Sequence, residues 1–251
     1  MERFIKELVK DAGKILKEKF RKVGVSRTKR NPLDVVTIAD VMVDKLITGR
    51  IKKKFPSHSI VAEESGNYNG NSKKWIIDPL DGTNNFSLGI PLFVTQIAYV
   101  EKDQLKFAAI YDPVHDELFY AQKGKGSFLN GKRIHVSAKT DFEYSQGCVD
   151  FGLTSGSLKI LNKIKQQIHH KSFWVRNLGA SGISGSLIAR GALDWSILTG
   201  CYVWDYAPLA LLIEEAGGRV TNLKGKPWHF SDNNIIAGNK DLVAKIIKII
   251  N

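Results

Sequence analysis

The chain has 251 residues, a formal charge of +12 and 43% apolar residues, the ordinary balance of a globular protein. This length is enough to bury a full core, which excludes a disordered tail and a mini-protein that needs disulfide staples. The basic balance points to anionic partners: nucleic acid, an anionic membrane or a phosphorylated substrate. However, only 9 of the 37 basic residues are Arg. Bidentate recognition of phosphate or guanine favours Arg, so this bias weighs against nucleic acid.

Two helices are predicted in the N-terminal segment. Apolar residues recur at helical spacing between Phe4 and Leu16, which predicts an amphipathic helix covering a core. Acidic residues on its polar face argue against membrane binding. A second helix is expected from about Asp40 to Lys54, ending before Pro56. No stretch resembles a signal peptide or a membrane span, so we expect a cytoplasmic protein that does not associate with membranes.

Strands dominate the middle of the chain, and strand–helix alternation follows Gly147. The expected strands are Ser59–Ala62, Trp75–Ile77, Phe93–Tyr99, Phe107–Tyr111 and Glu117–Ala121, with a loop at Ser65–Lys74, followed later by strands near Leu193–Leu198, Arg219–Thr221 and Asn234–Ala237. The later helices are expected near Ser157–Ile168, Ser181–Arg190, Asp205–Ala216 and Asp241–Ile250. The chain is therefore mixed α/β, and we expect an N-terminal subdomain over 1–145 and a C-terminal subdomain over 146–251.

The densest chemical signal lies between Trp75 and Phe86. An apolar strand places Asp78 at its end, and Pro79 and Gly82 predict a turn that returns Asp81 beside it. Two carboxylates this close repel each other, so they need a cation or a shared proton. Oxygen ligands favour Mg²⁺ or Ca²⁺ over softer metals. The competing interpretation is an ordinary surface turn.

The segment Gly82–Asn84 follows at once and is expected to begin a short helix. The free N–H groups of a helix start bind anions. A metal site next to an anion site suits a phosphate that is bound through Mg²⁺.

Three further acidic positions are candidates for the same site. Glu63 and Glu64 follow an apolar strand, where loops often hold functional residues. Asp205 precedes an apolar helix and Asp40 lies at a helix start. For these two residues a simple N-cap is the competing interpretation.

Taken together in chain order, these segments resemble the inositol monophosphatase family, the lithium-sensitive, magnesium-dependent phosphomonoesterases. The resemblance extends from about Lys29 to Asn239. The matching stretches are Asp34–Asp40, Ala62–Ser65, Trp75–Phe86 and Trp204–Asp205 leading to Glu215–Gly218. The resemblance implies a five-layer αβαβα sandwich of the inositol monophosphatase and fructose-1,6-bisphosphatase type, and a homodimer.

The resemblance also implies roles for individual residues around two or three Mg²⁺ ions. The implied metal ligands are Glu63, Asp78, the Leu80 carbonyl, Asp81 and Asp205. The implied catalytic residues are Glu63 and Thr83, which orient the attacking water, and Asp40, which accepts a hydrogen bond from Thr83. The implied phosphate and substrate contacts are Asp81, Gly82, Thr83, Asn84, Gly179, Ala180, Ser181 and Asp205. Lys29 matches a basic residue at the edge of the site.

The implied activity is hydrolysis of inositol 1-phosphate, or a similar small sugar phosphate, by in-line attack of a water that the metal activates. Leu198 stands where animal relatives carry a Glu that contacts inositol, so the preferred substrate stays open. Fructose-1,6-bisphosphatase, histidinol-phosphate phosphatase and adenosine bisphosphate nucleotidase are alternatives on the same site. A protein that binds RNA or a transcription complex is the non-enzyme alternative, motivated by the excess of Lys and by the versatility of the bacterial relatives that the resemblance brings in.

Overall fold

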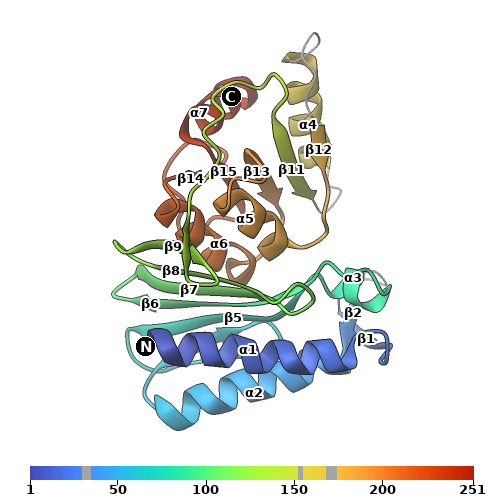
Figure 1. Ribbon diagram of the computed structural model, residues 1–251, viewed down its shortest axis with the longest axis vertical. Helices are drawn as coiled ribbons and strands as arrows, with labels where there is room; N and C mark the ends of the chain where they lie inside the picture. The colour runs from blue at the N-terminus through green and yellow to red at the C-terminus, as the bar shows by residue number, and fades with distance from the viewer. Residues whose placement is uncertain (30–34, 152–154, 168–173) are drawn as a thin grey trace.

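The computed structural model describes residues 1–29, 35–151, 155–167 and 174–251. Its elements stack in five layers, in which two sheets alternate with three pairs of helices (Figure 1). The order is α1 and α2, the larger sheet, α5 and α6, the smaller sheet, and α4 and α7. The predicted αβαβα sandwich is confirmed. Among the described residues, no helix has the length and apolar character needed to cross a membrane.

The first layer consists of α1 (Glu2–Lys19) and α2 (Ile38–Lys54), with a small hairpin of β1 (Val25–Thr28) and β2 (Val35–Thr37) between them in the chain. Most of the apolar stripe of α1 is buried against α2 and the larger sheet, as its periodicity predicts, and Phe4 and Ile15 are partly buried at its margin.

The start of α2 differs from the expectation in a way that concerns Asp40. The helix begins at Ile38 because Thr37 caps it: the Thr37 hydroxyl accepts the Ala39 N–H at 3.1 Å. Asp40 closes the capping box from the third helical position, its Oδ2 accepting the Thr37 N–H at 2.7 Å and hydroxyl at 2.6 Å. The N-cap interpretation of Asp40 is therefore wrong. Its other oxygen, Oδ1, lies 3.1 Å from the Thr83 hydroxyl.

The larger sheet has the strand order β10-β9-β8-β7-β6-β5-β3-β4, and all its pairs are antiparallel except β3 with β5. Its strands are β3 (Ser59–Ala62), β4 (Gly66–Tyr68), β5 (Lys73–Asp81), β6 (Val94–Glu101), β7 (Gln104–Asp112), β8 (Glu117–Gln122), β9 (Gly126–Leu129) and β10 (Lys132–Ile134). The expected loop at Ser65–Lys74 is partly wrong, because β4 adds an edge strand there by pairing with β3. Its polar side chains are exposed, so hydrophobic alternation could not reveal it.

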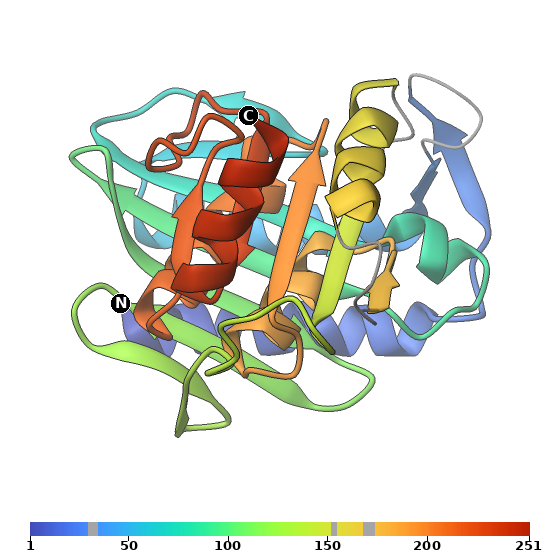
Figure 2. The same cartoon turned by 90° about the horizontal axis from the view of Figure 1, so that it is seen from above.

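The smaller sheet and the remaining helices follow in the C-terminal part of the chain. The sheet runs β12-β11-β13-β15-β14 and comprises β11 (Gln146–Phe151), β12 (Trp174–Arg176), β13 (Trp195–Thr199), β14 (Arg219–Thr221) and β15 (Asn234–Gly238). The helices are α4 (Ser155–Gln167), α5 (Ser181–Ala189), α6 (Val203–Glu215) and α7 (Lys240–Ile250). In Figure 2, α4 and α7 lie in front of this sheet. The expected end of α4 at Ile168, and Asp34 of a matching stretch, lie outside the described residues.

The central layer is the most enclosed part of the molecule. Helices α5 and α6 contact both sheets and each other, so α6 is apolar on every side from Tyr206 to Ile213. The two helices approach closely at Gly185, where an added Cβ would lie 2.4 Å from Leu209 Cβ. This close contact positions the first turns of both helices, which build the site described below.

We therefore expect Gly185→Ala to destabilise the fold by about 1–3 kcal/mol, because an extra methyl group overpacks the contact between α5 and α6. Gly49→Ala is the matched control: Gly49 is exposed inside α2 and has open space at its Cβ position. That change should stabilise by about 0.5–1 kcal/mol through backbone entropy. Urea unfolding of both variants measures the contrast. A neutral Gly185→Ala would show that the two helices are not tightly packed.

Candidate metal centre

Two of the acidic side chains reach the same face of the larger sheet because β5 contains a bulge. Side chains alternate along a strand, so residues 78 and 81 would ordinarily point to opposite faces. In the pairing with β6, Asp78 faces Gln96 and Asp81 faces Val94, so β5 has one extra residue between them. The extra residue restores both carboxylates to one face.

The expected turn at Pro79 is wrong, because the chain forms a bulge there and stays in β5. The strand runs on to Asp81, and the chain turns only at Gly82, whose φ of 86° is in the left-handed region. A proline suits a bulge because it has no N–H to contribute to the ladder. The sequence motif contains the two carboxylates that lie together in the structure, but a bulge rather than a turn brings them together.

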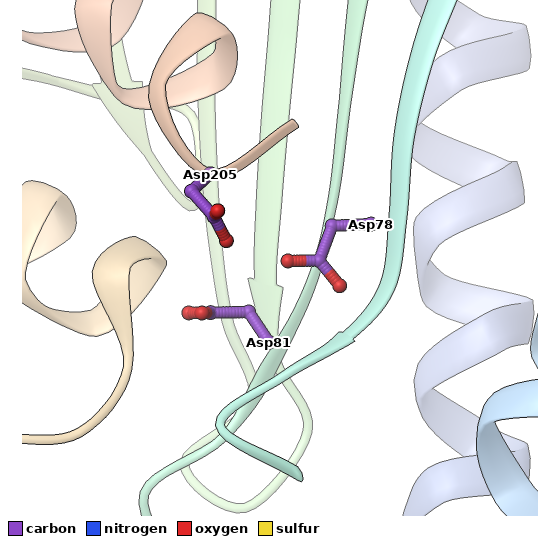
Figure 3. A group of neighbouring side chains, drawn as sticks. All are labelled: Asp78, Asp81 and Asp205. Carbon is purple, nitrogen blue, oxygen red and sulfur yellow. The ribbon is translucent and has the colours of Figure 1, made fainter. Parts of the chain in front are cut away.

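Asp205 joins the pair from the first turn of α6. One oxygen from each of Asp78, Asp81 and Asp205 lies within 4.8 Å of the others, and Figure 3 shows the three carboxylates pointing toward one another. Asp205 is the third residue of α6, and its Oδ2 accepts the Tyr202 N–H at 2.6 Å. The N-cap interpretation of Asp205 is therefore wrong, as it is for Asp40.

The start of α5 holds Asp81 in place. The Ser181 N–H donates to Asp81 Oδ1 at 3.0 Å and the Gly182 N–H donates to Oδ2 at 2.7 Å, while the Ser181 hydroxyl lies 3.2 Å from Oδ1. A Cβ on Gly182 would lie 2.6 Å from Val94 Cγ2, so only glycine allows this approach. Ser181, expected on the substrate side, also anchors an acidic side chain. The sequence analysis missed that role.

Thr83 links the turn after β5 to α2. It opens the short helix α3 (Thr83–Ser87), which confirms the helix expected there. Its hydroxyl lies 3.1 Å from Asp40 Oδ1 and 2.8 Å from the Leu80 carbonyl oxygen. A hydroxyl has one proton, so it donates to only one of these acceptors at a time. Engagement of the Leu80 oxygen by a cation would leave the proton for Asp40.

Glu63 lies beside the group of three rather than within it. It follows β3, and its N–H donates to the Ile77 carbonyl at 3.2 Å. Lys29 pairs with it, the Lys29 Nζ lying 2.8 Å from Glu63 Oε1 and 2.5 Å from Glu64 Oε1. Lys29 therefore stands at the edge of the centre and reaches both acidic residues.

The remaining predicted contact residues differ in accessibility. Asn84 is exposed, whereas Ala180 is 2% exposed, and Gly179 has a φ of +65°. Leu198 is fully buried in β13, and its apolar side chain offers no hydrogen-bond acceptor.

Burial and mutual repulsion disfavour the ionised form of these carboxylates. Burial, then the charges of Glu63, Asp81 and Asp205, raise the pKa of Asp78 well above its usual range. Burial, then Asp81, does the same to the pKa of Asp205. Burial also raises the pKa of Asp40 to about 6. Oxygen donors held together in this way suit a hard divalent cation, so the residues fit a metal site.

Comparison with known proteins agrees with this geometry. The Inositol monophosphatase family matches residues 1–251. Bovine inositol monophosphatase 1 is 32% identical over 250 residues, covering 96% of this chain and 90% of that protein. The fructose-1,6-bisphosphatase/inositol-1-monophosphatase of Thermotoga maritima is 32% identical and covers 98% of this chain and 93% of that protein. The extragenic suppressor protein suhB from Bartonella henselae superposes with a TM-score of 0.91 at 31% identity, covering 98% and 96% of the two chains.

The raised pKa values of these carboxylates set the sign of a pH effect in the metal-free protein. A carboxyl whose pKa is higher in the folded state stabilises the fold below its unfolded pKa and loses that contribution as pH rises through the folded pKa. We therefore expect Asp205→Asn, in EDTA at pH 8, to raise the free energy of unfolding by roughly 0.5–2 kcal/mol. The gain should be smaller at pH 5, where the wild-type carboxyls are more protonated. Thermal unfolding at the two pH values measures it.

Asp11→Asn is the control for this effect. Asp11 pairs with Lys14 and Arg50, whose contacts lower its pKa, so it contributes favourably at pH 8. Its replacement should leave stability unchanged or reduced at pH 8, the opposite sign to Asp205→Asn. A destabilised Asp205→Asn protein at pH 8 would contradict the charge repulsion described here.

Proposed function

The chain belongs to the inositol monophosphatase family, a family of phosphatases, and we propose that it is an Mg²⁺-dependent phosphomonoesterase for inositol 1-phosphate or a similar small sugar phosphate. The observation that carries the proposal is the convergence of Asp78, Asp81 and Asp205, of which the first two are buried and Asp205 is partly buried. Three carboxylates from two separate elements have no structural reason to lie this close together without a cation, because each loses hydration and repels the others.

The proposed metal ligands are Glu63, Asp78, the Leu80 carbonyl, Asp81 and Asp205. Their all-oxygen character favours Mg²⁺ over softer metals. When bound, Mg²⁺ neutralises phosphate charge and lowers the pKa of water toward 7, which supplies a nucleophile at neutral pH. Phosphomonoester hydrolysis is very slow without a catalyst, so such charge stabilisation has to provide most of the rate.

We assign Thr83 and Glu63 to orienting the attacking water. The contact between the Thr83 hydroxyl and Asp40 Oδ1, at 3.1 Å, supports this assignment. If the hydroxyl donates its proton to Asp40, the lone pairs of its oxygen are free to accept a hydrogen bond from water. Thr83 is then a positioning group and forms no phosphoenzyme. The N–H groups of Gly82, Thr83 and Asn84, at the start of α3, are assigned to the phosphate oxygens.

Substrate choice is expected to be broad. Leu198 is fully buried and carries no acceptor for a sugar hydroxyl, and a pocket that lacks such a contact discriminates weakly between polyols. The Thermotoga maritima relative is itself named for two substrates, fructose 1,6-bisphosphate and inositol 1-phosphate. We therefore propose a small phosphorylated polyol or sugar as the substrate class.

A substrate panel tests this proposal. We expect Mg²⁺-dependent phosphate release from inositol 1-phosphate and from glycerol 2-phosphate, and inhibition of both by Li⁺. The panel includes fructose 1,6-bisphosphate, histidinol phosphate and adenosine 3′,5′-bisphosphate, with released phosphate as the readout. Release from only one of these three would select the corresponding alternative. No release from any member would refute the proposed activity.

Asp81→Asn tests the metal assignment within the same assay. Loss of one ligand charge should reduce Mg²⁺-dependent turnover by about 100-fold or more. Asp112→Asn is the matched control, because Asp112 is also buried, at 5% exposed, but holds the backbone N–H groups of Val114 and His115 outside the centre. Undiminished turnover by Asp81→Asn would show that Asp81 does not bind the metal.

A further inference from the structure

Gln96 is a buried, uncharged polar residue next to Asp78 of the acidic cluster, and neither the sequence motifs nor the proposed mechanism uses it. It lies on β6 directly opposite Asp78 and is fully buried. Its Nε2 lies 3.2 Å from Asp78 Oδ2 and 3.2 Å from Ser181 Oγ. One amide group thus touches a carboxylate on the sheet and the first residue of α5.

Through Ser181 the same amide is connected to the other two aspartates. The Ser181 hydroxyl lies 3.2 Å from Asp81 Oδ1 and 3.3 Å from the Asp205 carbonyl oxygen. Gln96 and Ser181 therefore form a continuous chain of polar contacts. It links Asp78 and Asp81 on β5 to the first turn of α6. This chain of contacts crosses from the larger sheet to the central helix layer.

The orientation of the amide is fixed by what its neighbours can accept. An ionised carboxylate accepts hydrogen bonds only, so the NH₂ group has to face Asp78. The other oxygen of Asp78 accepts the Leu80 N–H at 3.1 Å. Both oxygens of this carboxylate are therefore oriented by a neutral donor, and each keeps lone pairs for a cation.

A neutral donor has a specific advantage at this position. A lysine beside Asp78 would cancel the negative charge that attracts a divalent cation, and a further carboxylate would add repulsion. An amide orients the carboxylate and leaves its charge intact.

Packing alone does not explain a glutamine here. Its Oε1 is buried and, within the described part of the chain, has no hydrogen-bond partner. The Oε1 atom lies next to Gly182, which leaves room for it because glycine has no side chain: a Cβ on Gly182 would lie 2.9 Å from Oε1. An unsatisfied buried acceptor lowers stability, so an apolar side chain of the same length would pack at lower cost.

We propose that Gln96 is a positioning residue of the metal centre, which holds Asp78 and Ser181 in the orientation that a divalent cation requires. The proposal rests on the metal site described under the proposed function. Partners of this kind, which contact a ligand rather than the metal, typically change metal affinity by about 10–100-fold. A residue kept only for packing would change stability and leave that affinity unaltered.

The test is Mg²⁺ binding to the folded protein by calorimetry, independent of turnover, with thermal unfolding in EDTA measured alongside. We expect Gln96→Met to weaken Mg²⁺ binding about 10–100-fold. Thermal unfolding in EDTA shows that the variant folds, because Gln96→Met removes both the unsatisfied Oε1 and the Nε2 contacts with Asp78 and Ser181. Gln96→Leu is a second variant of different shape, in case the first does not fold.

Thr95→Val is the matched control. Thr95 is the preceding residue on β6, is fully buried, and its hydroxyl has no partner among the described residues. It points to the opposite face of the sheet, so its replacement should leave the Mg²⁺ affinity within twofold of the wild type.

Three outcomes decide the matter. Weaker Mg²⁺ binding by the Gln96 variants, with the control unchanged, supports the positioning role. A Gln96 variant that binds Mg²⁺ within twofold of the wild type overturns it and leaves the proposed function standing. A wild-type protein that binds no Mg²⁺ overturns both, so the two failures are distinguishable.

Discussion

The main physical constraint on this structure is that it holds three mutually repelling carboxylates close together. One oxygen from each of Asp78, Asp81 and Asp205 lies within 4.8 Å of the other two. Burial raises the pKa of Asp78 and Asp205 well above the usual range. Holding such charges together costs folding free energy, so the surrounding structure has to fix each one separately. The bulge in β5, the two N–H groups of α5 that bind Asp81, and the Tyr202 N–H that binds Asp205 each perform this task.

These restraints come from different layers, which explains why the close packing of the central helices matters. Helices α5 and α6 lie between the two sheets and meet at Gly185, so their first turns are held at a fixed distance from β5. On the other side of the larger sheet, α2 contributes Asp40, whose one oxygen closes a capping box and whose other oxygen faces Thr83. The site is therefore a junction of three layers, and a small displacement of any layer would separate its ligands.

Net charge and local charge have opposite signs in this protein. The chain carries +12 overall, yet the cluster of Asp78, Asp81 and Asp205 is negative. Lys29 connects the two, because it reaches Glu63 and Glu64 at the edge of the centre. A basic exterior can draw phosphorylated molecules toward the protein, whereas the acidic cluster has the charge and the oxygen donors that suit a cation. Composition pointed to anionic partners, which agrees with membership of a phosphatase family, but it could not locate the place where the charge reverses.

The sequence by itself determined the mixed α/β class, most helices and the pair Asp78 and Asp81, because hydrophobic period and the strand-ending Asp-Pro-Leu-Asp-Gly-Thr motif are local properties. The five-layer arrangement and the other acidic positions of the site followed from the resemblance to the family. The sequence did not determine how those residues meet. Residues 78 and 81 share a face only because of a bulge, and Asp40 and Asp205 occupy the third position of their helices rather than the N-cap. The edge strand β4 and the contacts of Gln96 and Ser181 were equally hidden. Each depends on a partner distant in the chain, and the register and packing that select such a partner exist only in the folded protein.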